Sequence, residues 1–545
     1  MKRMLATLVF ISIVVCFLHG QTTFIIDGIK YNVIGNTSSV EIVNNGVSYS
    51  GSITIPSSVN YSGTIYTVTT IGNYAFQYSS GLTSITLPSS ITAINIYAFY
   101  YCSNLSDIFI PSSVISIEVS AFSGTPWLNN QPDGLVYAGK IALTYKGTMP
   151  ANTDFELKEG TCGIAGGAFS NCSGLKNIII PSTVKSIGSS AFYNCTNLAG
   201  INIPESVTSI DSYCFYKCSS LSDITIPATV SIIGNSAFEG TPWYNNQSDG
   251  VVYAGKMAYC YKGIMPENTS LVLKEGTVGI ATLAFYNCSS LTSITIPNSV
   301  KSLGNSVFSN CTNLSNTIIP NSVITIGSGA FNNCSSLTNM TIPNSVKTIG
   351  SGAFYNCSGL NKIDIPNSLT FIDGSSFNNC INLKSISIPN SVSSIGNSAF
   401  NNCSALTSIY AFAAIPVNLI NNINVFYNVN KSTCTLFVPY GSKSLYKEAN
   451  QWKDFTNVVE FDVSAVGNPA LKMPCIYYNS QNHSIQIRNI EKDMELAIVD
   501  MNGRLFLKQV VSSGEILSVG GLPKGVYIVK ENVVKNGFIS KFTIY

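Results

Sequence analysis

The stretch LTNMTIPNSVKTIGSGAF, Leu337 to Phe354, contains one unit of a repeat that decides the fold. The alternation of leucine, methionine and isoleucine before the proline predicts a short strand, and the Val-x-x-Ile-Gly segment predicts a second extended piece. One unit is too short to bury its apolar side chains alone, so a core requires that units stack. The apolar positions are Leu337, Met340, Ile342, Val346, Ile349, Ala353 and Phe354.

The same unit recurs along most of the chain. Its phenylalanine returns every 23 residues, except for two intervals of 47, and an Ile/Leu-Pro pair keeps the same spacing. A repeat of this period predicts a mainly β solenoid whose core is a set of side-chain ladders. The phenylalanines are Phe76, Phe99, Phe122, Phe169, Phe192, Phe215, Phe238, Phe285, Phe308, Phe331, Phe354, Phe377 and Phe400.

The residues that alternate with the ladder positions are hydroxyl and amide side chains. A strand turns successive side chains to opposite faces, so these residues are expected on the outside. Such a neutral face suits ordinary solvation or a binding role. The pairs are Ser84 and Thr86, Ser293 and Thr295, Asn339 and Thr341, and Ser385 and Ser387.

The two long intervals contain matching inserts that begin 116 residues apart, GTPWLNNQPDGLVYAGKIALTYKG from Gly124 and GTPWYNNQSDGVVYAGKMAYCYKG from Gly240. We expect β-hairpins near 124–160 and 240–276, turning at Asp133-Gly134 and Asp249-Gly250. Aromatic anchors often dominate interfaces, so the insert aromatics are candidate ligand-binding residues. Alternatively, the tryptophans cover the solenoid where a coil is altered. The candidates are Trp127, Tyr137, Trp243, Tyr244 and Tyr253.

Cysteine follows the repeat phenylalanine by three residues in ten units. This regularity predicts an inward ladder of small, buried thiols. Disulfides are the alternative in an exported chain, but in-register side chains point in parallel, which favours reduced thiols. Zinc is less favoured because paired CxxC spacing is absent. The ten are Cys102, Cys172, Cys195, Cys218, Cys288, Cys311, Cys334, Cys357, Cys380 and Cys403.

Composition argues against several functions. The net charge is +2 without basic runs, so nucleic acid is not an expected partner. The only histidines are His19 and His483, which leaves the repeats without histidine-based nucleophile or metal chemistry. We therefore predict no enzymatic activity, no catalytic residues, no cofactor and no bound metal.

The ends differ from the repeats. Lys2 and Arg3 before an apolar run predict a signal peptide at 1–20, and no later stretch of the mature chain qualifies as a transmembrane segment. We expect an N-terminal β cap at 21–70, repeats at 71–410, and a C-terminal cap at 411–463 with a helix around 444–450. A small β-sandwich is expected at 464–545.

The repeat L-x-x-I-x-I-P-x-x-V-x-x-I-G-x-x-A-F-x-x-C resembles the BspA-like leucine-rich repeats. The tail, with VDMNGRLFLKQ, LPKGVYIVK and SKFTIY, is similar to the C-terminal sorting domain of the type IX secretion system. The resemblance implies a sorting motif that contacts that secretion machinery, at Asn502, Gly503, Gly525, Tyr527 and Lys541.

Together, these likenesses imply a protein that is attached to the outer-membrane surface or extracellular. They imply adhesion to protein or glycan ligands on host or bacterial surfaces. The alternative is a surface spacer or coat without a specific ligand.

Overall fold

The computed structural model describes residues 23–34, 37–420, 422–461, 463, 475–479, 484–488, 494–500, 504–512, 516–519, 521–531 and 539–544. The expected signal peptide at 1–20 lies outside these residues. The chain separates into two compact units. The first comprises Met1–Lys384, Ser391–Leu406 and Val417–Val429, and the second Ser385–Asn390, Thr407–Pro416 and Asn430–Tyr545.

The N-terminal strands of the first unit lead directly into the solenoid. β1 (Thr23–Ile26) and β2 (Ile29–Val33) form a hairpin, β3 (Ser39–Val43) pairs antiparallel with β2, and β5 (Ser58–Tyr61) pairs antiparallel with β6 (Thr64–Ile71). β4 (Ser50–Thr54) and β6 already pair in parallel with strands of the following coils, β7 (Gly81–Thr86) and β8 (Ala93–Ile94). Coil stacking therefore begins within the range expected to be a cap.

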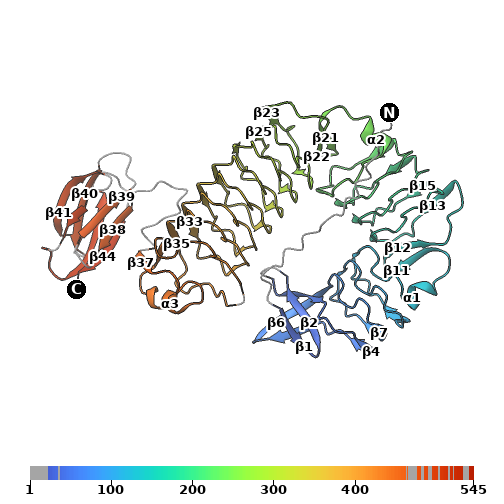
Figure 1. The fold of residues 1–545 in the computed structure, drawn as a ribbon, viewed down its shortest axis with the longest axis horizontal. Coiled ribbons are helices and arrows are strands. Elements are labelled where there is room, and N and C mark those ends of the chain that lie inside the picture. Colours follow the sequence, from blue (N-terminus) through green and yellow to red (C-terminus); the bar gives the residue numbers. More distant parts are fainter. Residues whose placement is uncertain are drawn as a thin grey trace, which may run out of the picture. The chain divides into compact units, whose positions relative to one another are not determined.

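Each later coil contributes two short strands that stack in parallel on those of its neighbours (Figure 1). Equivalent residues pair 23 positions apart, as Ser186 does with Ser209 and Ile187 with Ile210. This confirms the solenoid. The first strands of these coils, which a proline follows in all but β13 and β23, are β7 (Gly81–Thr86), β9 (Asp107–Phe109), β13 (Thr153–Glu156), β15 (Leu175–Ile179), β17 (Gly200–Asn202), β19 (Asp223–Thr225), β23 (Thr269–Val272), β25 (Leu291–Thr295), β27 (Asn316–Thr317), β29 (Asn339–Thr341) and β31 (Lys362–Asp364).

The second strand of each coil is the Val-x-x-Ile segment and is only two residues long in most coils. Its isoleucine or leucine is buried, and its other residue is partly or largely exposed in most coils. These strands are β8 (Ala93–Ile94), β10 (Ser116–Ile117), β14 (Gly163–Ile164), β16 (Ser186–Ile187), β18 (Ser209–Ile210), β20 (Ile232–Ile233), β24 (Gly279–Ile280), β26 (Ser302–Leu303), β28 (Thr325–Ile326), β30 (Thr348–Ile349), β32 (Phe371–Ile372) and β34 (Ser394–Ile395).

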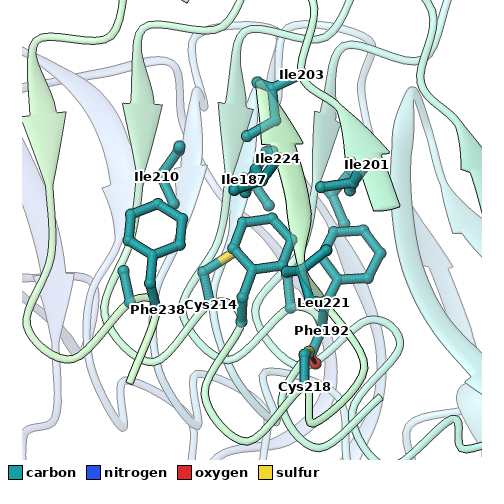
Figure 2. Packing of buried hydrophobic residues seen from close by; sticks show 14 of the residues in the cluster. Ile187, Phe192, Ile201, Ile203, Ile210, Cys214, Cys218, Leu221, Ile224 and Phe238 are labelled. Atoms are coloured by element: carbon teal, nitrogen blue, oxygen red, sulfur yellow. Dashed lines mark hydrogen bonds between the residues drawn. The ribbon is translucent and has the colours of Figure 1, made fainter. Parts of the chain in front are cut away.

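The repeat phenylalanines stack face to face through the interior. The Phe192 and Phe215 rings lie 5.3 Å apart and 3° from parallel. Figure 2 shows Phe192 and Leu221 in one buried cluster with Ile187 and Ile210. Each fully buried phenylalanine contributes about 1.5–3 kcal/mol. The ladder extends to Phe426, whose ring lies 5.7 Å from that of Phe400, although the spacing there is 26 residues.

The cysteines form the predicted inward ladder. Eight of the thiols donate to the carbonyl oxygen of the phenylalanine 26 residues earlier, as Cys195 does to Phe169 at 3.0 Å. Burial raises the pKa of Cys102 to about 11 and of Cys357 to about 12. No two cysteines of the described ranges are bonded to each other. Their redox state in the exported chain stays a prediction.

A ladder of asparagines that was not predicted from the sequence lies beside the cysteines. The residue two positions after each repeat phenylalanine is left-handed, a conformation that asparagine tolerates better than most residues. Asn333 donates its side-chain amide to Asn310 at 2.7 Å, and Asn310 donates to Asn287 at 2.8 Å. These bonds tie neighbouring coils together at the surface.

The two inserts have the same backbone. Short helices, α1 (Pro126–Asn129) and α2 (Pro242–Asn245), precede the hairpins β11 (Gly134–Ala138) with β12 (Ile141–Lys146) and β21 (Gly250–Ala254) with β22 (Met257–Lys262). The predicted turn positions are wrong. Gly139 and Gly255 supply the positive φ for the two-residue turns, whereas Asp133-Gly134 and Asp249-Gly250 lie at the open ends.

The outward strand face is less uniformly polar than expected. The predicted hydroxyl and amide residues are partly or fully exposed. Large apolar side chains nevertheless share this face: Phe109 is 72% exposed, Ile179 61%, Val272 75% and Ile318 78%. Pattern alone identified the face, but not these exceptions.

The second unit contains a short parallel sheet, β33 (Ser385–Ile388), β35 (Ser408–Ala411), β36 (Thr435–Pro439) and β37 (Asn457–Phe461), with the helix α3 (Lys443–Glu448). The expected helix around 444–450 is α3. Trp452 and Tyr446 are buried and their rings lie 5.4 Å apart.

The tail forms two antiparallel sheets, and one buried cluster contains residues of both. Its arrangement as a sandwich stays a prediction. The strands are β38 (Cys475–Asn479), β39 (Ser484–Arg488), β40 (Met494–Asp500), β41 (Leu505–Val511), β42 (Ile516–Ser518), β43 (Gly525–Glu531) and β44 (Ile539–Ile544).

Candidate binding surfaces

The insert tryptophans cover interrupted ends of the phenylalanine ladder. The Trp127 ring lies 5.0 Å from Phe122 and the Trp243 ring 4.9 Å from Phe238, and both tryptophans are partly buried. Each therefore takes the place of the next phenylalanine in the stack. This is the covering role weighed from sequence, and ligand binding by these two residues stays a prediction.

Tyr137 and Tyr253 attach their hairpins to the following turn. The Tyr137 hydroxyl accepts a hydrogen bond from the backbone N–H of Lys158 at 3.0 Å. The Tyr253 hydroxyl accepts one from the backbone N–H of Lys274 at 2.9 Å. The ammonium groups of the same lysines lie over these rings, 4.5 and 4.4 Å from the centroids. Both tyrosines thus have internal partners, and a role in binding stays a prediction.

Tyr244 packs inside the second insert. Its ring lies 6.2 Å from Tyr259 at 89°, and its hydroxyl lies 3.9 Å from the Cys260 thiol that donates to it. Burial, followed by the neighbouring Cys260, raises the pKa of Tyr244 well above its usual range. The phenol therefore stays protonated and part of the local packing.

A separate group of aromatic side chains lies on the bends of the first coils. We call it the tyrosine surface: Tyr74, Tyr78, Tyr97, Tyr100 and Tyr101. Tyr74 stacks on Tyr97 at 5.5 Å, and Tyr100 contacts Tyr97, Tyr101 and Tyr78 at 4.7, 4.6 and 5.8 Å. Tyr74, Tyr78 and Tyr101 are 43%, 60% and 52% exposed. Five contacting rings therefore face solvent together.

Four members of this surface occupy left-handed backbone positions, with φ of 58° at Tyr74 and Tyr78, 54° at Tyr97 and 52° at Tyr101. Bulky residues adopt this conformation at a cost of about 1–3 kcal/mol. Most later coils place glycine, serine or asparagine at the same positions. Tyrosine is thus used where stability alone favours other residues, which indicates a surface role.

Sequence reasoning missed the tyrosine surface because it searched the inserts for aromatics. The signal was present: five tyrosines fall between residues 74 and 101, at positions where later units carry mostly small or amide residues. Only the structure shows that these five side chains lie together on the outside of the bends.

No cluster of metal-binding side chains occurs within the described residues, and no described helix is long and apolar enough to cross a membrane. Among the expected sorting residues, Asn502 and Gly503 lie outside the described ranges. Tyr527 is buried, and its hydroxyl donates to the Pro523 carbonyl at 2.7 Å. Gly525 begins β43 beside that ring, and Lys541 belongs to β44.

Comparison with known proteins gives one family match. The model of the BspA type leucine rich repeat region matches six copies, over residues 45–131, 145–248, 257–384 and 325–452. No curated protein matches the chain.

Several solved structures are similar. A leucine-rich repeat protein from Bacteroides ovatus is 27% identical, over 71% of this chain and 94% of that chain, with a TM-score of 0.25. A leucine rich cell surface protein from Faecalibacterium prausnitzii is 25% identical, over 82% and 96%, with a TM-score of 0.26. The pneumococcal vaccine antigen PcpA is 19% identical, over 81% and 98%, with a TM-score of 0.26.

Proposed function

Because this chain belongs to the BspA type leucine-rich-repeat family, we propose that it is an exported, non-catalytic binding module that adheres to protein or glycan surfaces. The tyrosine surface is the observation that carries the proposal. Contiguous exposed aromatic residues are uncommon on proteins without partners. Tyrosine also supplies a large contact area at a low cost in side-chain entropy.

The geometry provides fold-preserving variants for a test. Asparagine occupies the positions of Tyr78 and Tyr101 in most later coils, where it is compatible with the left-handed backbone. The double change Tyr78→Asn and Tyr101→Asn therefore removes two exposed rings without straining the coils. A matched control is Tyr286→Ser, at an exposed tyrosine of a later coil.

The experiment measures binding of the mature chain to host matrix proteins, host cells and bacterial cells. We expect at least one component to bind, the double variant to bind at least tenfold more weakly, and the Tyr286 control to keep its affinity. Failure to bind across the panel would favour a spacer role instead. Undiminished binding by the double variant would show that the tyrosine surface is not the binding site.

The tail is proposed to direct passage across the outer membrane. The support is its resemblance to the type IX sorting domain, including Tyr527 and Gly525, which the fold brings together. Protease shaving and mass spectrometry of fractionated cells should find the full chain processed after residue 20 and exposed outside. A chain truncated before Val463 should stay in the periplasm. Equal surface exposure of both forms would contradict this route.

The absence of catalysis is part of the same proposal. Residues 21 to 482 contain no histidine, and burial raises the pKa of the ladder thiols, which keeps them protonated at neutral pH. Incubation with polysaccharide and peptide substrates should release no product above background.

A further inference from the structure

A cavity of about 360 Å³ lies at the first insert. Its walls come from the coil before the insert, the helix α1, the strand β12 and the coil after the insert. The lining includes Glu118, Phe122, Leu128, Leu143, Gly167 and Tyr193. It therefore combines apolar walls with one carboxyl group and several hydroxyl groups.

The cavity exists because the hairpin replaces the bend of one coil. In an ordinary pair of coils, the phenylalanine N–H donates to a carbonyl of the next bend, as Phe99 does to Ala121 at 2.7 Å. After Phe122 the chain continues into the hairpin, so no such bend follows. Within the described residues, the Phe122 N–H donates to no acceptor, and Phe122 itself is 1% exposed. A buried donor without a partner costs about 1–3 kcal/mol.

The second insert fills the corresponding space with its own side chains. At an offset of 116 residues, Leu143 corresponds to Tyr259, Leu128 to Tyr244 and Gly167 to Leu283. The Tyr259 ring lies 5.3 Å from Phe238, and its hydroxyl accepts the Phe238 N–H at 3.2 Å. Tyr259 thus shows which chemical group satisfies this site: an aromatic ring carrying a hydroxyl.

The first insert places Glu118 where the second has Gly234, whereas the second places Glu239 where the first has Ser123 of the cavity lining. Glu118 is partly buried and accepts a hydrogen bond from the Ser116 hydroxyl at 3.2 Å. Burial, with a smaller contribution from Asp211, raises the pKa of Glu118. A partner hydroxyl that donates to this carboxyl group would replace part of its lost hydration.

We propose that the cavity at the first insert binds a tyrosine side chain of a partner protein. The ring lies against Leu128 and Leu143, and the phenol oxygen accepts the Phe122 N–H in the way that Tyr259 accepts the Phe238 N–H. Glu118 receives the phenol hydrogen. The site is distinct from the tyrosine surface, so its test does not depend on that surface or on an identified adhesion partner.

The test uses the full mature chain and N-acetyltyrosinamide as the probe, with N-acetylphenylalaninamide and methyl glucoside as comparison ligands. We expect binding with a dissociation constant on the order of 1 mM. The phenylalanine analogue should bind at least fivefold more weakly, and methyl glucoside should not bind. The variant Leu143→Tyr, which carries the residue found at the second insert, should weaken probe binding at least tenfold while its circular dichroism spectrum stays unchanged.

A gain-of-function variant protects the test against misfolding. Changing Tyr244→Leu, Tyr259→Leu and Leu283→Gly together should open the second insert and raise the number of bound probe molecules. No probe binding to the wild-type chain, or binding that Leu143→Tyr leaves intact, would overturn the proposal. Binding of methyl glucoside that Leu143→Tyr abolishes would also overturn it, since the cavity would then be a sugar site.

Discussion

The two inserts share a backbone but differ in how they are packed. Thr125 and Thr241 both cap their helices, accepting N–H groups at 3.2 and 3.1 Å. Lys146 and Lys262 both donate to the carbonyl at the end of the helix, at 2.7 Å in each insert. The side chains at the missing bend are smaller in the first insert, Leu128 and Leu143, than in the second, Tyr244 and Tyr259. The duplication thus retained the threonine caps and the lysine contacts of both hairpins. We call the first insert open, because it contains the cavity, and the second insert closed, because Tyr244 and Tyr259 lie in the corresponding space.

The largest expected difference concerns the tryptophans. Trp127→Ala should lower the free energy of unfolding of the solenoid by about 3 kcal/mol, because it uncovers Phe122. Trp243→Ala should cost about 1 kcal/mol less, since Tyr259 still covers Phe238. Urea denaturation of both variants gives the comparison. Equal losses would show that Tyr259 does not support the second insert.

The rate at which a thiol reacts should differ between the closed second insert and the open first insert. Burial raises the pKa of Cys260 to about 11, so at pH 8 its thiolate fraction falls by roughly a hundredfold relative to an ordinary cysteine. A cysteine at the corresponding position of the first insert, Thr144→Cys, faces the cavity and should react faster with iodoacetamide. Peptide mass spectrometry resolves the two sites, and similar rates would argue against an open first insert.

Exchanging the packing residues at positions 143 and 259 should have unequal effects on stability. Tyr259→Leu removes a buried ring and the acceptor of the Phe238 N–H, and should cost about 2 kcal/mol. Leu143→Tyr supplies an acceptor to the Phe122 N–H, and should change stability by less than about 1 kcal/mol. Thermal unfolding measures both. A loss from Leu143→Tyr as large as that from Tyr259→Leu would show that the first insert has no room for the ring.

The smallest effect concerns Glu118. Folding raises the pKa of the Glu118 carboxyl group. Its contribution to stability is therefore complete below the pKa of the unfolded chain, about 4.3, and is lost as the pH rises through the pKa of the folded chain. Glu118→Gln should therefore be more stable than the wild type at pH 7, by less than about 1 kcal/mol, and equal to it near pH 4. Urea denaturation of both proteins at pH 4 and pH 7 checks this. A difference between variant and wild type that is larger at pH 4 than at pH 7 would contradict a raised pKa of Glu118.

Repetition made most of the fold predictable. The 23-residue spacing was enough to identify the Phe192 ladder, the Cys195 ladder and the outward strand face, because stacked coils bring equivalent residues into contact. The hairpin turn was misplaced because both Asp133-Gly134 and Gly139-Lys140 carry turn residues. Only the pairing of Ala138 with Ile141 distinguishes them.

The candidate sites were less predictable because they depend on departures from the repeat. The tyrosine surface requires left-handed tyrosines in neighbouring coils, and the cavity requires Leu143 and Gly167 in place of the larger Tyr259 and Leu283 of the second insert. No local pattern joins residues of the hairpin to those of the coil after it. The insert aromatics were identified from sequence, but their partners Phe122, Lys158 and Cys260 were visible only in the structure.

Hydrogen exchange of two backbone amides tests the open and closed inserts most directly. The N–H groups of Phe122 and Phe238 lie at equivalent, buried positions, but only the second donates a hydrogen bond within the described residues. We expect the Phe238 amide to exchange at least tenfold more slowly than the Phe122 amide, and Leu143→Tyr to slow the latter. Equal exchange of the two amides in the wild-type chain would contradict the difference between the inserts.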